Sequence, residues 1–292
     1  MEKLANDTSM GLVDLLVRDL DVMTAYYHEG IGLDVLETKG DVVTLGRKGE
    51  VPSPIVRLTR RTDLPAFNRG DAGLFHAAIV FDTKADLAAS VLSTARHASA
   101  SFTGSSDHLV SEAFYFDDPE GNGVELYVDR PRHAWEYLEG GQVNMATLPL
   151  DPNAFLAEHL NDSTRGADGA HVGHVHLQVG SIAEAEAFYS GVLGFDVMNR
   201  YGTQALFVAA GGYHHHLGLN TWNSRGAGAR AASLGLERVA IDVPNPEEIT
   251  RISARLREAG IDADIRTDEA AAETRLVTTD PWGTRVEIAA AA

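Results

Sequence analysis

The sequence predicts an α+β fold in which four βαβββ modules pair into two curved mixed sheets, each a half-barrel. The first observation behind this prediction is an internal duplication, because residues 12–36 and 174–198 share one pattern. Val17, Tyr27 and Gly32 each have an identical residue 162 positions further along the chain. The second observation is that a strand, a helix and further strands recur twice within each half. One offset that holds over more than a hundred residues indicates a duplicated half rather than chance similarity.

Each module is expected to begin with a short strand rich in β-branched residues and to continue into an amphipathic helix. The helix of the first module should begin after Asp19, and that of the third after Ser181, which completes a capping box with Glu184. The other two helices are expected near residues 84–97 and 246–259. The first pair of modules (10–130) divides into 10–62 and 72–130, and the second pair (171–290) into 171–224 and 234–290, with a linker at 131–170. Because a lone module leaves one sheet face uncovered, the modules should pair around two cavities.

Composition and charge exclude several classes of function. The chain of 292 residues has no cysteine, so any metal must be held by histidine and carboxylate. The net charge of −18 argues against nucleic acid or an anionic membrane as a partner. No apolar run approaches the roughly 20 residues that span a bilayer, and the N-terminus lacks a secretory apolar stretch. A cytoplasmic protein is therefore expected.

Most of the twelve histidines are expected to be surface residues, but three groups lie at the beginning of predicted strands. His174 lies in the run HVGHVH, His76 lies in LFHAAIVF, and the triplet 214–216 opens HHHLGLNTW. For each of them, the simpler interpretation is a histidine satisfied in the core or at a sheet edge.

Two glutamates help to decide whether these histidines are structural or bind a metal. Glu125 and Glu287 each follow a Pro/Gly turn and have apolar neighbours on both sides. A carboxylate buried between such neighbours is costly unless it is paired or bound to a metal. Two neutral imidazoles and one carboxylate on adjacent strands would form a facial triad, which leaves positions on Fe(II) for substrate and dioxygen.

The strand-opening histidine, the helix that ends in FYSGVLGFDV and the segment DPEGNGVELY together resemble the vicinal oxygen chelate superfamily. This superfamily contains glyoxalases, bleomycin-resistance proteins and extradiol dioxygenases. The segments GHVHLQV, GGYHHHLGLNTWNSRGAG and DHLVSEAFYFDDPEGNGVELYVDRP resemble its catechol 2,3-dioxygenase-like branch. The resemblance covers nearly the whole chain apart from the linker. It implies a non-haem, metal-dependent extradiol ring-cleaving dioxygenase that acts on a small aromatic diol with dioxygen as co-substrate.

The resemblance also implies that the metal ligands come from the first and last strands of the modules. The second module offers His76 and Glu125, and the third offers His174, whereas the first module has Leu12 at the ligand position. Pairing the second module with the third therefore gives His76, His174 and Glu125 as ligands of Fe(II) or Mn(II). The active cavity would then lie between modules 72–130 and 171–224.

Pairing the third module with the fourth gives a different set of metal ligands, with His214, His216 and Glu287 as the alternative. In that set, Arg238 stands at the position that His76 has in the second module, and its guanidinium would repel the metal. The sequence favours the first pairing over this one.

Three further residues are implied in catalysis. His215 is expected to act as the general acid and base, with a turn histidine or a fourth metal ligand as the alternatives. Tyr115, ten residues before Glu125, would orient a substrate oxygen, and His108 would hydrogen-bond to the groups around the site. Association into a homo-oligomer is left open.

Two other functions are weighed. A glycine-rich dinucleotide loop and a Gly-x-Ser-x-Gly elbow are both absent from the sequence. Another metal-dependent reaction on the same scaffold, such as isomerisation or thiol transfer, is the first alternative. The second is a small-molecule binding protein of the bleomycin-resistance kind that holds no metal.

Overall fold

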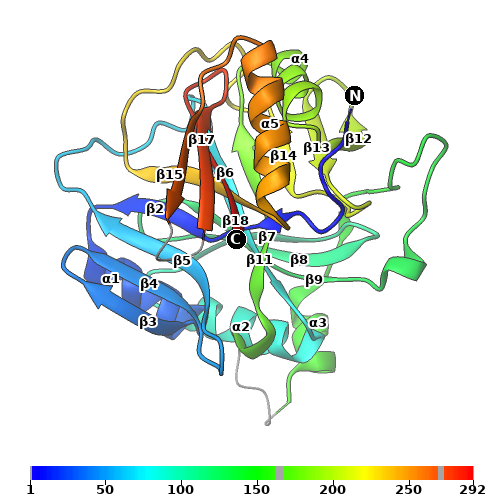
Figure 1. The fold of residues 1–292 in the computed structure, drawn as a ribbon. Coiled ribbons are helices and arrows are strands. Elements are labelled where there is room, and N and C mark those ends of the chain that lie inside the picture. Colours follow the sequence, from blue (N-terminus) through cyan, green and yellow to red (C-terminus); the bar gives the residue numbers. More distant parts are fainter. Residues whose placement is uncertain (1, 162–166, 269–272, 292) are drawn as a thin grey trace.

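In the computed structural model, which describes residues 2–161, 167–268 and 273–291, the strands form two nine-stranded mixed sheets (Figure 1). The first module comprises β2 (Val13–Val17), α1 (Leu20–Ala25), β3 (Asp34–Lys39), β4 (Val42–Arg47) and β5 (Ser53–Arg60) and follows β1 (Ser9–Met10). The second comprises β6 (Gly73–Phe81), α2 (Lys84–Arg96), β7 (Ser101–Asp107), β8 (Ser111–Asp117) and β9 (Gly123–Asp129).

The second half of the chain repeats this order of elements. A connection with a 3-10 turn (Arg132–Ala134), β10 (Leu148–Pro149), α3 (Pro152–His159) and a second 3-10 turn (Ala167–Gly169) leads into it. The third module comprises β11 (His171–Gln178), α4 (Ile182–Ala185), β12 (Asp196–Tyr201), β13 (Ala205–Ala209) and β14 (Leu217–Asn220). The fourth comprises β15 (Gly235–Val243), α5 (Pro246–Glu258), β16 (Asp264–Asp268), β17 (Glu273–Thr279) and β18 (Arg285–Ala291).

The inner two modules build one sheet and the outer two build the other. One sheet has the order β10-β7-β8-β9-β6-β11-β14-β13-β12, and the other β16-β17-β18-β15-β2-β5-β4-β3, with β1 added on β15. The two modules of each sheet meet at an antiparallel seam, β6 with β11 and β15 with β2. Within each of the four modules, the first and last strands run parallel. The predicted α+β class with curved mixed sheets is confirmed.

The helices of the first and third modules begin as expected and then widen. The side chain of Asp19 accepts from the Val22 amide, and that of Ser181 accepts from the Glu184 amide. The sequence pattern indicates a continuous α-helix in each case, but the backbone changes to π-helical turns at Tyr26–Gly30 and Glu186–Val192. Such turns insert one extra residue per turn and are rare outside sites with a specific requirement.

Both π-helical turns hold a fully buried tyrosine against the Asp-Pro turn of the following module. The Tyr27 hydroxyl donates to Asp118 at 3.2 Å, and the Tyr189 hydroxyl donates to Asp280 at 3.0 Å. Burial raises the pKa of Asp118 to about 6, although hydrogen bonds from Asn122, Glu120 and Tyr27 act against this. The duplicated helix therefore fixes the turn that precedes each glutamate-bearing strand.

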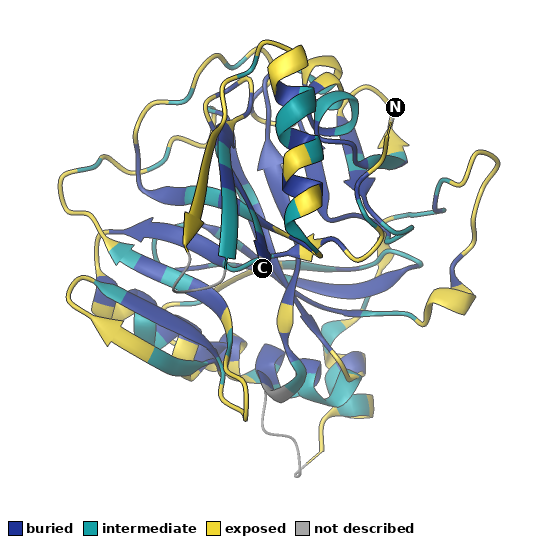
Figure 2. Cartoon of the chain, viewed as in Figure 1, coloured by how far each residue is buried: buried dark blue, intermediate teal, exposed yellow. Residues whose placement is uncertain are grey.

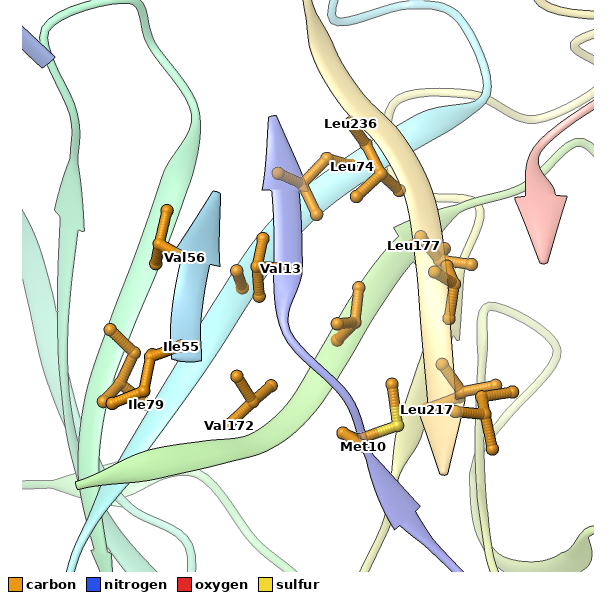
Figure 3. Packing of buried hydrophobic residues seen from close by; sticks show 14 of the residues in the cluster. Met10, Val13, Ile55, Val56, Leu74, Ile79, Val172, Leu177, Leu217 and Leu236 are labelled. Atoms are coloured by element: carbon orange, nitrogen blue, oxygen red, sulfur yellow. The ribbon is translucent and has the colours of Figure 1, made fainter. Parts of the chain in front are cut away.

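The hydrophobic core lies between the two sheets. Val13 and Leu236 from one seam pack in the same cluster as Leu74 and Leu177 from the other (Figure 3). The strands at the two seams are mostly buried, whereas the outer face of α5 is exposed (Figure 2). None of the helices in the described ranges combines the length and apolar character that a membrane crossing needs.

Candidate metal centre

Four side chains form a row across the sheet of the inner modules. Tyr115 on β8 pairs with Glu125 on β9, Glu125 pairs with Ala78 on β6, and Ala78 pairs with His174 on β11. Directly paired residues point to the same sheet face, and so do residues two apart along one strand. His76 therefore lies on the same face as Ala78, and the small Ala78 leaves space between the glutamate and His174.

The row brings three ligand atoms to one point. His76 Nε2 lies 2.8 Å from Glu125 Oε2, and His174 Nε2 lies 3.1 Å from the same oxygen. The two Nε2 atoms are 3.4 Å apart. All three side chains are buried. Within the described part of the chain, this is the group of histidine and carboxylate side chains that meets the geometry of a metal site.

The electrostatics of this group suit a divalent cation. Burial by itself raises the pKa of Glu125, but His174 and His76 outweigh it and hold the pKa well below its usual range. Burial lowers the pKa of His174 to about 4. The group therefore presents an ionised carboxylate and a neutral imidazole near pH 7, which are the forms that bind metal. The residues fit a metal with two histidines and one carboxylate as ligands.

A cavity of about 690 Å³ lies over His76 and Glu125. Its lining also includes both residues of the Tyr115–His108 pair. His108 Nδ1 donates to the Ala146 carbonyl at 2.7 Å, so His108 Nε2 carries the lone pair that accepts from the Tyr115 hydroxyl, also at 2.7 Å. Burial raises the pKa of Tyr115 well above its usual range, so the phenol stays protonated. Its oxygen remains free to accept a hydrogen bond.

The three consecutive histidines have different surroundings. His215 lines the cavity, and its ring centroid lies 4.1 Å from that of His174. His214 is fully buried and donates through Nε2 to Asp129 at 2.9 Å. His216 accepts from the Ala210 amide through Nδ1.

The structure does not bring together the alternative ligand set of His214, His216 and Glu287. The triplet immediately precedes β14 in one sheet, whereas Glu287 lies on β18 in the other. Glu287 is neutralised there by Arg238 at 3.1 Å and Arg275 at 3.0 Å. The physical reason is the pairing of the modules, since the third module shares its sheet with the second and not with the fourth.

In the sheet of the outer modules, a guanidinium lies where the duplication would place a metal. Arg238 corresponds to His76 by the 162-residue offset, and Glu287 corresponds to Glu125. Arg238 bridges Glu287 and Asp14, each at 3.1 Å, and its side chain is only 11% exposed. The positive charge of the arginine stabilises the buried carboxylates there.

His176 is a site residue that the sequence analysis did not select. It faces His76 across the seam, the two ring centroids are 4.9 Å apart, and it lines the cavity. A Cβ atom at Gly218, its neighbour on β14, would lie 2.8 Å from the His176 ring, so the glycine makes room for it. The alternation of strand side chains was the available signal, because His174 and His176 must share a face.

Acid sensitivity is expected at His216. Burial lowers its pKa to about 3, whereas the unfolded chain takes up that proton near pH 6.5. Its contribution to stability is therefore complete above about pH 6.5 and decreases as the pH falls. Between pH 7 and pH 5 the free energy of unfolding should fall by about 2 kcal/mol from this residue alone.

The variant His216→Asn keeps an oxygen that can accept from the Ala210 amide but cannot titrate in this range. Urea unfolding of both proteins at pH 7 and pH 5 measures the difference. An equal loss of stability in the two proteins would show that His216 is not the source of the acid sensitivity.

The fold and the site define a protein with paired βαβββ modules and a buried group of two histidines and one carboxylate beside a cavity. A profile for the glyoxalase/bleomycin resistance protein/dioxygenase superfamily matches residues 171–288. The catechol-2,3-dioxygenase of Bacillus subtilis (strain 168) is 36% identical over 271 residues, covering 89% of this chain and 91% of that protein. The chain belongs to the glyoxalase/bleomycin resistance protein/dioxygenase superfamily.

Solved structures show the same fold at low sequence identity. One is a protein from Bacillus subtilis strain 168 whose structure is named as a dioxygenase. It has a TM-score of 0.67 at 13% identity, covering 99% of this chain and 86% of that one. Glyoxalase I from Zea mays has a TM-score of 0.57 at 17% identity, covering 97% of this chain and 92% of that one. The fold is therefore common to proteins with different chemistry.

Proposed function

We propose that the chain is an extradiol dioxygenase that opens a catechol-type ring with dioxygen. The observation that carries this proposal is the buried cluster of His76, Glu125 and His174 beside a cavity that Tyr115 and His215 also line. The modules at 72–130 and 171–224 would form the working unit. The similarity to a protein named catechol-2,3-dioxygenase supports the same reaction.

His76, Glu125 and His174 would hold Fe(II) or Mn(II). When bound, such an ion would supply a Lewis-acidic centre for both catechol oxygens and for dioxygen. Around it, the chain's own groups position the substrate. The Tyr115 oxygen, whose hydrogen is directed to His108, accepts from a substrate hydroxyl. Burial holds the pKa of His215 well below the usual range, so the ring is neutral and has a lone pair that can accept a phenolic proton.

Oxygen uptake with catechol as the substrate tests this proposal. Protein loaded anaerobically with Fe(II) should consume dioxygen and form a yellow ring-opened product. Metal binding without oxygen uptake would favour an isomerase or thiol transferase of the same superfamily. A cavity that binds aromatic ligands but no metal would favour a binding protein.

The lining of the cavity favours an uncharged substrate with an apolar substituent. Phe75, Phe207 and Trp222 form an aromatic wall beside His176, with Phe75 and Trp222 in edge contact at 5.2 Å between ring centroids. Among the described lining residues, Arg69 is the only lysine or arginine, and it is paired with Asp117 at 2.6 Å. A carboxylate on the substrate ring would lose water without gaining a free cation.

We therefore expect 4-methylcatechol to be a better substrate than 3,4-dihydroxybenzoate. The value of kcat/KM should be at least about tenfold lower for the carboxylate, which corresponds to about 1.4 kcal/mol of lost transition-state stabilisation. Steady-state oxygen consumption with the two compounds measures this ratio. Equal or reversed values would show that Arg69 is available to bind the carboxylate.

A further inference from the structure

A chain of hydrogen bonds leads from a carboxylate through one histidine to the histidine that lines the cavity. Asp129 Oδ1 lies 2.9 Å from His214 Nε2, and His214 Nδ1 lies 2.8 Å from His215 Nδ1. We propose that Asp129 and His214 are positioning residues that fix the His215 ring with a proton on Nδ1 and an unprotonated Nε2 toward the cavity. This inference rests on the proposed function, because it concerns the residue that would take up the substrate proton.

The direction of each hydrogen bond follows from what the groups can donate. A carboxylate can only accept, so His214 Nε2 carries a proton. In a neutral imidazole the other nitrogen then has the lone pair, so His214 Nδ1 accepts and His215 Nδ1 donates. The remaining nitrogen of His215, Nε2, is left unprotonated. Of the three consecutive histidines, His215 is the one that lines the cavity.

The carboxylate that begins this chain is itself held on both oxygens. Asp129 Oδ2 accepts from the Tyr213 hydroxyl at 2.8 Å, and the Tyr127 hydroxyl lies 2.8 Å from that of Tyr213. Burial raises the pKa of both tyrosines well above the usual range, so they remain donors. Tyr213 therefore donates to Asp129, Tyr127 donates to Tyr213, and the carboxylate cannot rotate without losing a bond.

His214 also lies close to the candidate metal centre. Its ring centroid lies 6.0 Å from that of His174, a proposed ligand of a divalent cation, and the side chain is fully buried. With His214 Nδ1 as the acceptor, this hydrogen bond sets which nitrogen of the His215 ring is free.

The variant Asp129→Asn tests the proposal, because an amide can donate to His214 Nε2 and reverse both hydrogen bonds. With catechol as substrate, kcat should fall about 10- to 100-fold, the range typical of groups that orient site residues. The KM for catechol and the metal content should stay within about twofold, since the metal ligands and Tyr115 are untouched. The matched control is Asp196→Asn, which should keep full activity. Asp196 lies on the same sheet as Asp129 and forms an exposed ion pair with Lys3.

A second measurement reads the proton position without any turnover. Long-range ¹H–¹⁵N spectra of the Zn(II)-loaded protein show which nitrogen of each histidine ring is protonated, and His215→Gln assigns the signal. We expect a protonated Nδ1 in the unchanged protein and a protonated Nε2 in Asp129→Asn. This result would support the positioning role even if catechol proved not to be the substrate.

The proposal is overturned if His215 carries its proton on Nε2 in the unchanged protein. It is also overturned if metal-loaded Asp129→Asn has the same kcat as the unchanged metal-loaded protein. Should Asp129→Asn fail to fold, His214→Phe provides the same test, because it keeps a ring of similar size and removes the acceptor for His215. It should lose kcat to the same extent. Full activity of that variant would also contradict the proposal.

Discussion

Replacing His76 by alanine is expected to abolish metal binding and oxygen uptake. His76 and His174 together surround one oxygen of Glu125, at 2.8 and 3.1 Å, so its loss leaves one imidazole and one carboxylate. The affinity for Fe(II) should fall by more than about 100-fold, since even groups that only orient a ligand account for 10- to 100-fold. Metal analysis after desalting, together with an oxygen electrode, measures both effects.

The control for His76→Ala is a change at Glu287, which corresponds to Glu125 in the other sheet. Glu287→Gln should leave the metal content and the oxygen uptake unchanged, because Glu287 pairs with Arg238 and Arg275 and not with the histidines. If metal is retained in His76→Ala but lost in Glu287→Gln, the prediction is contradicted, because the metal centre would then lie in the sheet of the outer modules.

Replacing Arg238 by methionine is expected to destabilise the protein strongly without removing the metal. The change leaves two buried carboxylates, Glu287 and Asp14, without their shared cation. Breaking a buried ion pair on one side costs 3–5 kcal/mol, and we expect about 3 kcal/mol because Arg275 and Arg57 still face the carboxylates. Urea unfolding followed by circular dichroism measures this loss.

The double variant Arg238→Met with Glu287→Leu separates the effect of charge from that of packing. Removing both partners of a buried pair is often neutral or stabilising, so the double variant should recover the part of the loss that comes from Glu287. The part that comes from Asp14 should remain, because Asp14 keeps only Arg57. A single variant that is as stable as the unchanged protein would show that the guanidinium has no structural role.

The duplication made most of the fold predictable. One offset related the two halves, and strands rich in β-branched residues followed by helices with N-cap residues indicated the modules. The α+β class and the superfamily are confirmed. The π-helical turns at Tyr26–Gly30 and Glu186–Val192 were not predictable, because the apolar spacing there also suits an α-helix.

The site residues that could be predicted from the sequence are those whose place in the site follows from their position along a strand. His76, Glu125 and His174 lie together in the structure, and their role as metal ligands remains a prediction. Asp129 was not selected, because its importance depends on neighbours that only the strand register reveals. His176 was also not selected, although its alternation with His174 along one strand was an available signal. Glu287 was retained as an alternative because its local sequence resembles that of Glu125, and only the distant Arg238 and Arg275 distinguish it.

The nested arrangement of the two sheets has a consequence for how the chain is made on the ribosome. The sheet with the candidate metal centre spans β10 to β12 in space but uses only residues between Gly73 and Asn220, so it can be completed before synthesis ends. β2 in the other sheet must wait for β15, which begins at Gly235. Until then the edge of β2 is open to aggregation or to chaperones, so a prematurely terminated chain would keep a completed sheet with the candidate metal centre attached to an unprotected strand.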